Sequence, residues 1–96
     1  MQARFLSIAQ KELLDSMAYY EQMDPGLGIK FMEEVEETVA FIMQYPQSGM
    51  LLNAYARRVL LNRFPFGVVY RLRGSELVIL SIMHLKREPN FWIKRT

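Results

Sequence analysis

Residues 64–87, FPFGVVYRLRGSELVILSIMHLKR, decide the fold of this chain. Between Phe66 and Arg73 the side chains alternate: one side carries Phe66, Val68, Tyr70 and Leu72, and the other carries Val69, Arg71 and Arg73. A period of two predicts a β-strand with one apolar face and one cationic face. The stretch therefore begins with a strand that belongs to a sheet covered on one side.

A tight turn and a second strand complete the stretch. Gly74-Ser75 predicts a two-residue type II′ turn, because glycine at the first central position accommodates the positive φ that this turn needs. Residues 77–83 are almost continuously apolar, so we expect the second strand to be covered on both faces and to lie centrally. His84, the only histidine, ends it. We expect the function to lie at the cationic sheet face and at this histidine-bearing exit.

The size and composition bound the class of protein. Ninety-six residues make one domain, spanning residues 1–96. The absence of cysteine excludes disulfides, thiolate metal sites and a cysteine nucleophile. We find no signal peptide and no apolar run as long as a membrane span, so we expect a cytoplasmic protein without a membrane partner.

The charge is divided unequally along the chain. Residues 1–45 carry three cations and eight acids, a net charge of −5, whereas residues 46–96 carry nine cations and two acids, a net charge of +7. Such asymmetry indicates an acidic partner or a nucleic acid on the C-terminal half. The alternative is an ordinary solvated surface whose two halves neutralise each other, and charge alone does not separate the two.

The first half of the chain predicts a short strand and a helix. Residues 2–8 are expected to form a strand at or near a sheet edge. From Ala9 to Tyr20 apolar side chains recur at helical spacing, with Ser7 as the expected N-cap.

A second helix should begin with Asp24 as N-cap and Pro25 in its first position, and end before Pro46. The two helices then form an αα-hairpin that can cover one side of a sheet. We expect the glutamates of the second helix to form a solvated face and not a metal cluster: Glu33, Glu34, Glu36 and Glu37.

The remaining segments set the order of elements. Residues 46–54 predict a loop and residues 55–62 a strand that leads into the hairpin of residues 64–87. The order is therefore β-α-α-β-β-β, in the α+β class. We expect a small, mainly antiparallel sheet with a helical hairpin packed on one face.

Three groups of residues, spread over nearly the whole chain, carry a family resemblance: YYE (19–21) with PGLG (25–28), FPF (64–66) with YR (70–71), and His84 with Arg87, Pro89 and Trp92. With them the chain resembles the RelE/ParE superfamily, the toxins of type II toxin–antitoxin systems, and it is more similar to the ParE-like side. The resemblance implies a β-α-α-β-β-β toxin domain that a cognate antitoxin binds and silences.

The resemblance implies one of two targets. ParE-like toxins act on DNA gyrase and lack a recognised catalytic set, whereas RelE-like toxins are ribosome-dependent mRNA interferases that need no metal. The implied partners are a small acidic antitoxin in a hetero-oligomer and DNA gyrase, or alternatively the ribosome and mRNA. Growth inhibition and plasmid stabilization are the implied roles, without a cofactor or a metal.

The catalytic candidates apply only to an mRNA interferase. His84 would serve as acid or base, and Arg63, Arg71 and Arg87 would bind the phosphate. Residues 55–63 contain no Asp or Glu, and no tyrosine follows Tyr70, so the acid–base set of RelE-like nucleases is incomplete. We therefore favour the ParE-like alternative and expect His84 to be a strand-end histidine hydrogen-bonded to the backbone or to a tail residue.

The candidate partner-binding residues are four arginines and two aromatic residues of the tail: Arg57, Arg58, Arg63, Arg87, Phe91 and Trp92. For the aromatic residues we prefer the alternative that the tail packs back over a hydrophobic groove, because large aromatic side chains are seldom left exposed.

Overall fold

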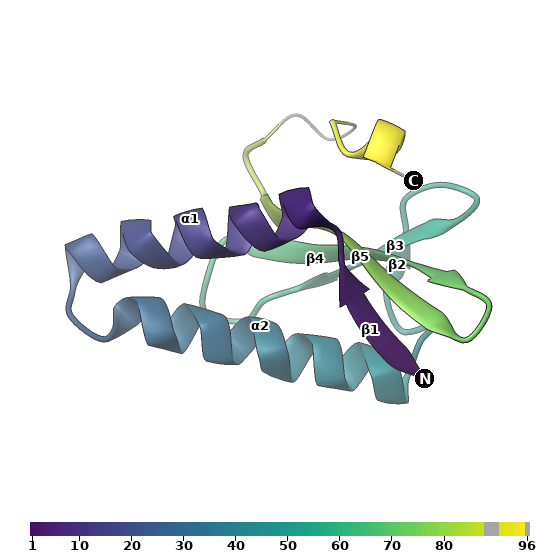
Figure 1. Cartoon of the computed structure of the whole chain (residues 1–96), viewed down its shortest axis with the longest axis horizontal. Helices are drawn as coiled ribbons and strands as arrows, with labels where there is room; N and C mark the ends of the chain where they lie inside the picture. The colour runs from purple at the N-terminus through teal and green to yellow at the C-terminus, as the bar shows by residue number, and fades with distance from the viewer. Residues whose placement is uncertain (88–90, 96) are drawn as a thin grey trace.

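Two long helices and a five-stranded sheet make up the computed structural model, which describes residues 1–87 and 91–95 (Figure 1). Of the family motif read from the sequence, Pro89 lies outside the described residues. The elements are β1 (Gln2–Phe5), α1 (Ser7–Met23), α2 (Leu27–Gln44), β2 (Met50–Leu51), β3 (Ala56–Leu60), β4 (Phe66–Arg73), β5 (Glu76–His84) and the short 3₁₀ helix η1 (Ile93–Arg95).

The strands are arranged in the order β1-β5-β4-β3-β2. β1 pairs with β5 in parallel, and the other neighbours are antiparallel. The predicted α+β class, the mainly antiparallel sheet and the edge position of the first strand are therefore confirmed. β5 lies between β1 and β4, so its continuous apolar sequence correctly predicted an inner strand.

The hairpin of β4 and β5 forms as predicted, with one irregularity. Gly74 has a φ of 63°, and Arg73 pairs with Glu76 on either side of the two-residue turn. Further along, Val69 pairs with Ser81 while Tyr70 pairs with Ile79, which leaves one residue of β5 unpaired. This bulge reverses the alternation of side chains in the second half of β5.

The paired helices α1 and α2 cover one face of the sheet (Figure 1). An aromatic cluster lies between the layers: the ring of Phe31 is 5.4 Å from Tyr20, 5.1 Å from Phe64 and 4.8 Å from Phe66 between centroids. Edge-to-face and offset contacts of this kind add to the free energy gained by apolar burial. The FPF segment thus enters the core that joins the hairpin to both helices.

The opposite face of the sheet is less cationic than its sequence suggested. Val69, Leu80 and Met83 form a second buried cluster there, and Trp92 of the tail covers it with an exposed fraction of only 1%. The tail therefore packs back over a hydrophobic groove, which confirms the preferred alternative for this segment. We call this side of the sheet the tail face.

The predicted helix caps are wrong. Leu6 is the N-cap of α1, and Ser7 already belongs to the helix; α2 has Gly26, with φ 90°, as its N-cap. The carboxylate of Glu21 accepts hydrogen bonds from the backbone N–H groups of Gly26 (2.9 Å) and Gly28 (3.1 Å). The Glu21 carboxylate thus pairs with backbone N–H groups at the start of α2, which the side chain of Asp24 was expected to do. Asp24 is instead the C-cap of α1.

Two further expectations need correction. Glu34 does not face water: it is 5% exposed and accepts hydrogen bonds from the backbone of Asn62 and Arg63. The predicted loop of residues 46–54 contains β2, which pairs with β3. Within the described chain, no helix has the length and apolar character needed to span a membrane.

Candidate functional site

His84 lies at the end of β5 and is hydrogen-bonded within the chain. Its Nδ1 accepts a hydrogen bond from the backbone N–H of Lys86 at 3.1 Å, and its ring packs edge-on against Phe66 at 5.0 Å. The expectation of a strand-end histidine bonded to the backbone is therefore confirmed. The side chain also lines a hollow of about 580 Å³ between α1 and the hairpin, together with Asp15, Ser16, Tyr19, Tyr20, Met23, Pro65 and Phe66.

Arg87 belongs to a different group of residues, centred on Glu12 of α1. The Glu12 carboxylate accepts hydrogen bonds from Arg87 (3.3 Å), from both terminal nitrogens of Arg95 (2.9 and 3.0 Å) and from the hydroxyl of Ser81 (2.9 Å). Arg95 also donates to the backbone oxygen of Leu80. This network joins α1, β5 and the tail. Nothing in the local sequence indicated it, because Glu12 and Arg95 lie 83 positions apart.

Arg57 and Arg63 also have partners within the chain. Arg57 donates to the backbone oxygens of Gln47 (3.1 Å) and Gly49 (2.8 Å) and so holds the loop before β2. Arg63 pairs with the buried Glu34 at 3.4 Å, although its own side chain remains largely exposed. Of these two predicted partner-binding residues, Arg63 is the more exposed to solvent.

Arg58 and Arg71 lie on the tail face. The guanidinium carbon of Arg71 is 4.7 Å from the ring centroid of Tyr55. The stem of Arg58 crosses Gly67, where a Cβ would be only 2.8 Å from its Cδ. The Nε atoms of both arginines are shielded from solvent, and neither has a hydrogen-bond partner in residues 1–87 and 91–95.

The catalytic candidates do not line one pocket. Arg63 lines a neighbouring hollow on the other side of Pro65, and neither Arg71 nor Arg87 lines the hollow that contains His84. Arg87 instead pairs with Glu12. In the described part of the chain, no group of three or more His, Asp or Glu side chains could hold a metal ion.

The two aromatic candidates of the tail differ in accessibility. Trp92 is buried, so its ring is not offered to a partner in this conformation. Phe91 is half-buried, and its ring stacks beneath the guanidinium groups of Arg87 (3.8 Å) and Arg95 (4.8 Å).

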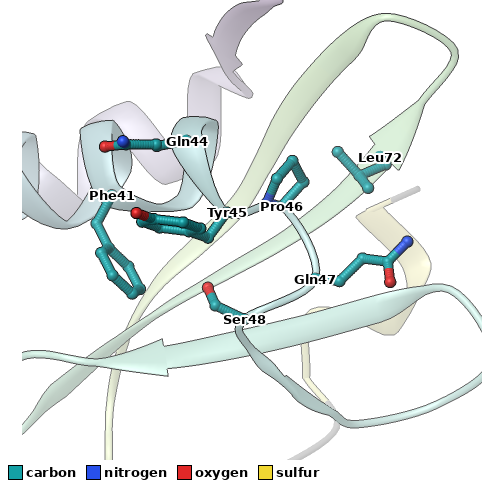
Figure 2. Close-up of a pocket in the computed structure, with 7 residues that line it drawn as sticks. All are labelled: Phe41, Gln44, Tyr45, Pro46, Gln47, Ser48 and Leu72. Atoms are coloured by element: carbon teal, nitrogen blue, oxygen red, sulfur yellow. The ribbon is translucent and has the colours of Figure 1, made fainter.

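An exposed apolar groove lies at the C-terminal end of α2 (Figure 2). Its volume is about 770 Å³, and Phe41, Tyr45, Pro46 and Leu72 supply its apolar walls. The rings of Phe41 and Tyr45 are 5.3 Å apart and each is about half exposed, at 46% and 53%. Aromatic side chains of this kind are enriched in the cores of protein–protein interfaces. The sequence did not single out this groove, because its walls come from α2, the following loop and β4.

The chain is thus an α+β domain with an exposed apolar groove and several accessible arginines. Among the described residues, the catalytic candidates do not come together into an acid–base site. No protein-family model and no curated protein sequence matches the chain. Among solved structures, the chain is similar to one described as "Chromosomal ParDE TA system from P. aeruginosa", with a TM-score of 0.79 and 23% identity. The match covers 90% of this chain and 97% of that chain, and it shows a shared fold.

Proposed function

We propose that this chain is the toxin of a type II toxin–antitoxin system and that it inhibits DNA gyrase in the manner of ParE-like toxins. The observation that carries the proposal is the fold, which over 90% of the chain is that of a chain in a ParDE TA system. In this proposal the protein acts in the cytoplasm, and a small acidic antitoxin neutralises it in a hetero-oligomer.

Two features support inhibition by protein–protein contact over RNA cleavage. Metal-free RNA cleavage needs an acid, a base and cations around one phosphate. Here Arg71 stacks on Tyr55 and Arg87 binds Glu12, and neither lines the hollow that contains His84. The exposed groove beside Phe41 and Tyr45 offers apolar surface of the kind that protein partners cover.

The proposal is tested in two stages. Induced expression of the chain in bacteria should arrest growth, and co-expression of a small acidic protein encoded beside its gene should restore growth. The purified chain should then inhibit supercoiling by gyrase in vitro, and the purified antitoxin should reverse the inhibition. His84→Ala is the control variant, which should inhibit gyrase as well as the unchanged chain.

Other results would assign another function. Ribosome-dependent cleavage of a reporter message that His84→Ala abolishes would identify an mRNA interferase and overturn the gyrase proposal. Expression without any growth defect, together with tight binding of the antitoxin, would identify a chain that retains only antitoxin binding.

A further inference from the structure

Two hollows meet at Leu72, near the end of β4. One is the apolar groove beside Phe41 and Tyr45, in which Pro46 lies between Tyr45 and Leu72 (Figure 2). The other has a volume of about 240 Å³, and two arginines, two tyrosines and two apolar residues line it: Arg57, Arg71, Tyr55, Tyr70, Ala54 and Leu72. We call it the arginine hollow. Because Leu72 lines both, the apolar groove leads into the arginine hollow.

The loop of residues 46–49, which supplies one wall of the groove, is held by side chains of the arginine hollow. The buried hydroxyl of Tyr70 donates to the backbone oxygen of Pro46 (2.8 Å) and accepts from the backbone N–H of Gly49 (3.1 Å). Arg57 donates to the backbone oxygens of Gln47 (3.1 Å) and Gly49 (2.8 Å). These bonds fix the groove before a partner arrives, so binding costs little additional ordering.

The positive charge of the arginine hollow is not balanced from within the chain. No acid lines either hollow, and Arg57 and Arg71 form no ion pair within residues 1–87 and 91–95. Both hydrogen bonds that Arg57 donates to the loop come from Nη1, so Nη2 keeps its hydrogens for another acceptor. The two arginines are half-buried, and partial shielding from water strengthens their attraction for a carboxylate.

We propose that the apolar groove and the arginine hollow together bind one segment of an acidic partner polypeptide. An apolar side chain of this segment packs against Phe41 and Tyr45, and a nearby carboxylate of the same segment accepts hydrogen bonds from Arg57 and Arg71. This rests on the proposed function, in which the partner is the antitoxin. A polypeptide supplies both groups, whereas a nucleic acid would pair with the arginines and leave the apolar walls in water.

NMR titration of the whole chain tests the site. The probes are the capped peptide Leu-Ser-Leu-Ser-Glu-Ser-Glu and the same residues in reverse order, because the groove does not fix the direction of the bound segment. Analogues replace both glutamates with glutamine or both leucines with serine. We expect one acidic peptide to shift the amide signals of Gln47 and Ser48 with saturation and to leave Gly26, at the other end of α2, unchanged. Each analogue should bind at least about tenfold more weakly.

Substitutions in the chain then test each half of the site against a matched control. Phe41→Ser should weaken binding of the acidic peptide about tenfold, and Ile29→Ser, at a similarly exposed position of α2 outside the groove, less than about twofold. Arg71→Gln should weaken it about fivefold, and Arg73→Gln, at an exposed position of the same strand, less than about twofold. The glutamine analogue should not distinguish Arg71→Gln from the unchanged chain, because it has no carboxylate to lose a partner. Thermal unfolding of every variant confirms that it is folded.

Each other outcome overturns the inference. Equal losses in the control variants would show non-specific attraction, and tighter binding of a short oligouridylate RNA would assign the arginines to a nucleic acid. Shifts of Gln47 and Ser48 that follow the protein concentration without peptide would assign the groove to a second copy of the chain, and no saturable shift would leave it without an occupant. If the antitoxin reverses gyrase inhibition by Phe41→Ser at the same concentration as for the unchanged chain, the proposed function stands and this site alone fails. Peptide binding by a chain that neither arrests growth nor inhibits gyrase gives the converse.

Discussion

Glu34 illustrates how one residue can depart from the pattern of its neighbours. Glu33 and Glu37 on the same helix are exposed, but the Glu34 carboxylate enters the gap between α2 and the segment that precedes Phe64. There it accepts hydrogen bonds from two consecutive backbone N–H groups, those of Asn62 and Arg63. The residue thereby fixes the entry of the FPF segment into the aromatic core.

Removal of this carboxylate should destabilise the fold. We expect Glu34→Ala to lower the free energy of unfolding by about 2–3 kcal/mol, because it leaves two backbone donors and Arg63 without their acceptor. Glu33→Ala, at an exposed position of the same helix, should change it by less than about 0.5 kcal/mol. Urea unfolding followed by circular dichroism measures both values, and equal effects would contradict the role of Glu34.

The elements differ in how well the sequence predicted them. The hairpin of β4 and β5 was predicted because its alternation and its Gly74-Ser75 turn are local signals. The helix caps were not, because Glu21 reaches Gly26 and Gly28 across the interhelical turn. In the candidate site, His84 was placed correctly at a strand end.

The neighbours of the other candidate residues depend on tertiary contacts that no sequence period encodes. Arg87 meets Glu12, 75 positions away, and Arg63 meets Glu34, 29 positions away.

The tail offers a test of such a tertiary contact. Glu12→Ala removes the carboxylate that accepts hydrogen bonds from Arg95 and from the hydroxyl of Ser81. The side chains of Arg95 and Glu12 are only 10% and 13% exposed, so the variant leaves a buried guanidinium without its ion-pair partner. We expect a loss of about 3 kcal/mol in the free energy of unfolding and a red-shifted, more readily quenched fluorescence of Trp92. Asp15→Ala, which removes only an exposed pair with Lys11 on the same helix, is the control. Unchanged fluorescence of Glu12→Ala would show that apolar packing alone holds the tail.

An ion pair between Arg4 and Glu76 joins the edge strand β1 to β5. Arg4 donates to Glu76 at 3.0 Å, and this hydrogen bond is the main reason that the pKa of Glu76 lies below its ordinary value of 4.5. A lowered pKa means that the pair stabilises the fold above about pH 4.5, and that this contribution is lost as the pH falls through the folded-state pKa.

Arg4→Gln should therefore raise the pKa of Glu76 towards its ordinary value and flatten the acid limb of the stability curve. Arg73→Gln should raise this pKa by less, because Arg73 acts on Glu76 only through its charge and is the weakest of the causes. An NMR titration of the Glu76 carboxyl carbon ranks the two variants. The reverse order would show that the hydrogen bond from Arg4 is not the main cause.

The whole molecule combines an acidic helical layer with a sheet and tail rich in cations. The glutamates on the outer side of α2 are exposed, and residues 46–96 carry a net charge of +7. Several of the arginines of the sheet and tail form ion pairs with Glu12, Glu34 or Glu76 of the same chain. The cations that remain accessible favour contact of the sheet side, and not of the helical side, with an acidic partner such as the proposed antitoxin.

If the proposed antitoxin binds the sheet side, its association with the chain should depend on ionic strength. Salt shortens the Debye length from about 10 Å at 0.1 M to about 3 Å at 1 M. We expect the association rate, measured by stopped-flow fluorescence of Trp92, to fall about tenfold over this range while the dissociation rate changes little. Arg58→Gln should reduce this salt dependence, and Glu36→Gln, which removes a charge from the helical side, should leave it unchanged. An association rate that does not respond to salt would mean that apolar surface such as the groove beside Phe41 directs the encounter.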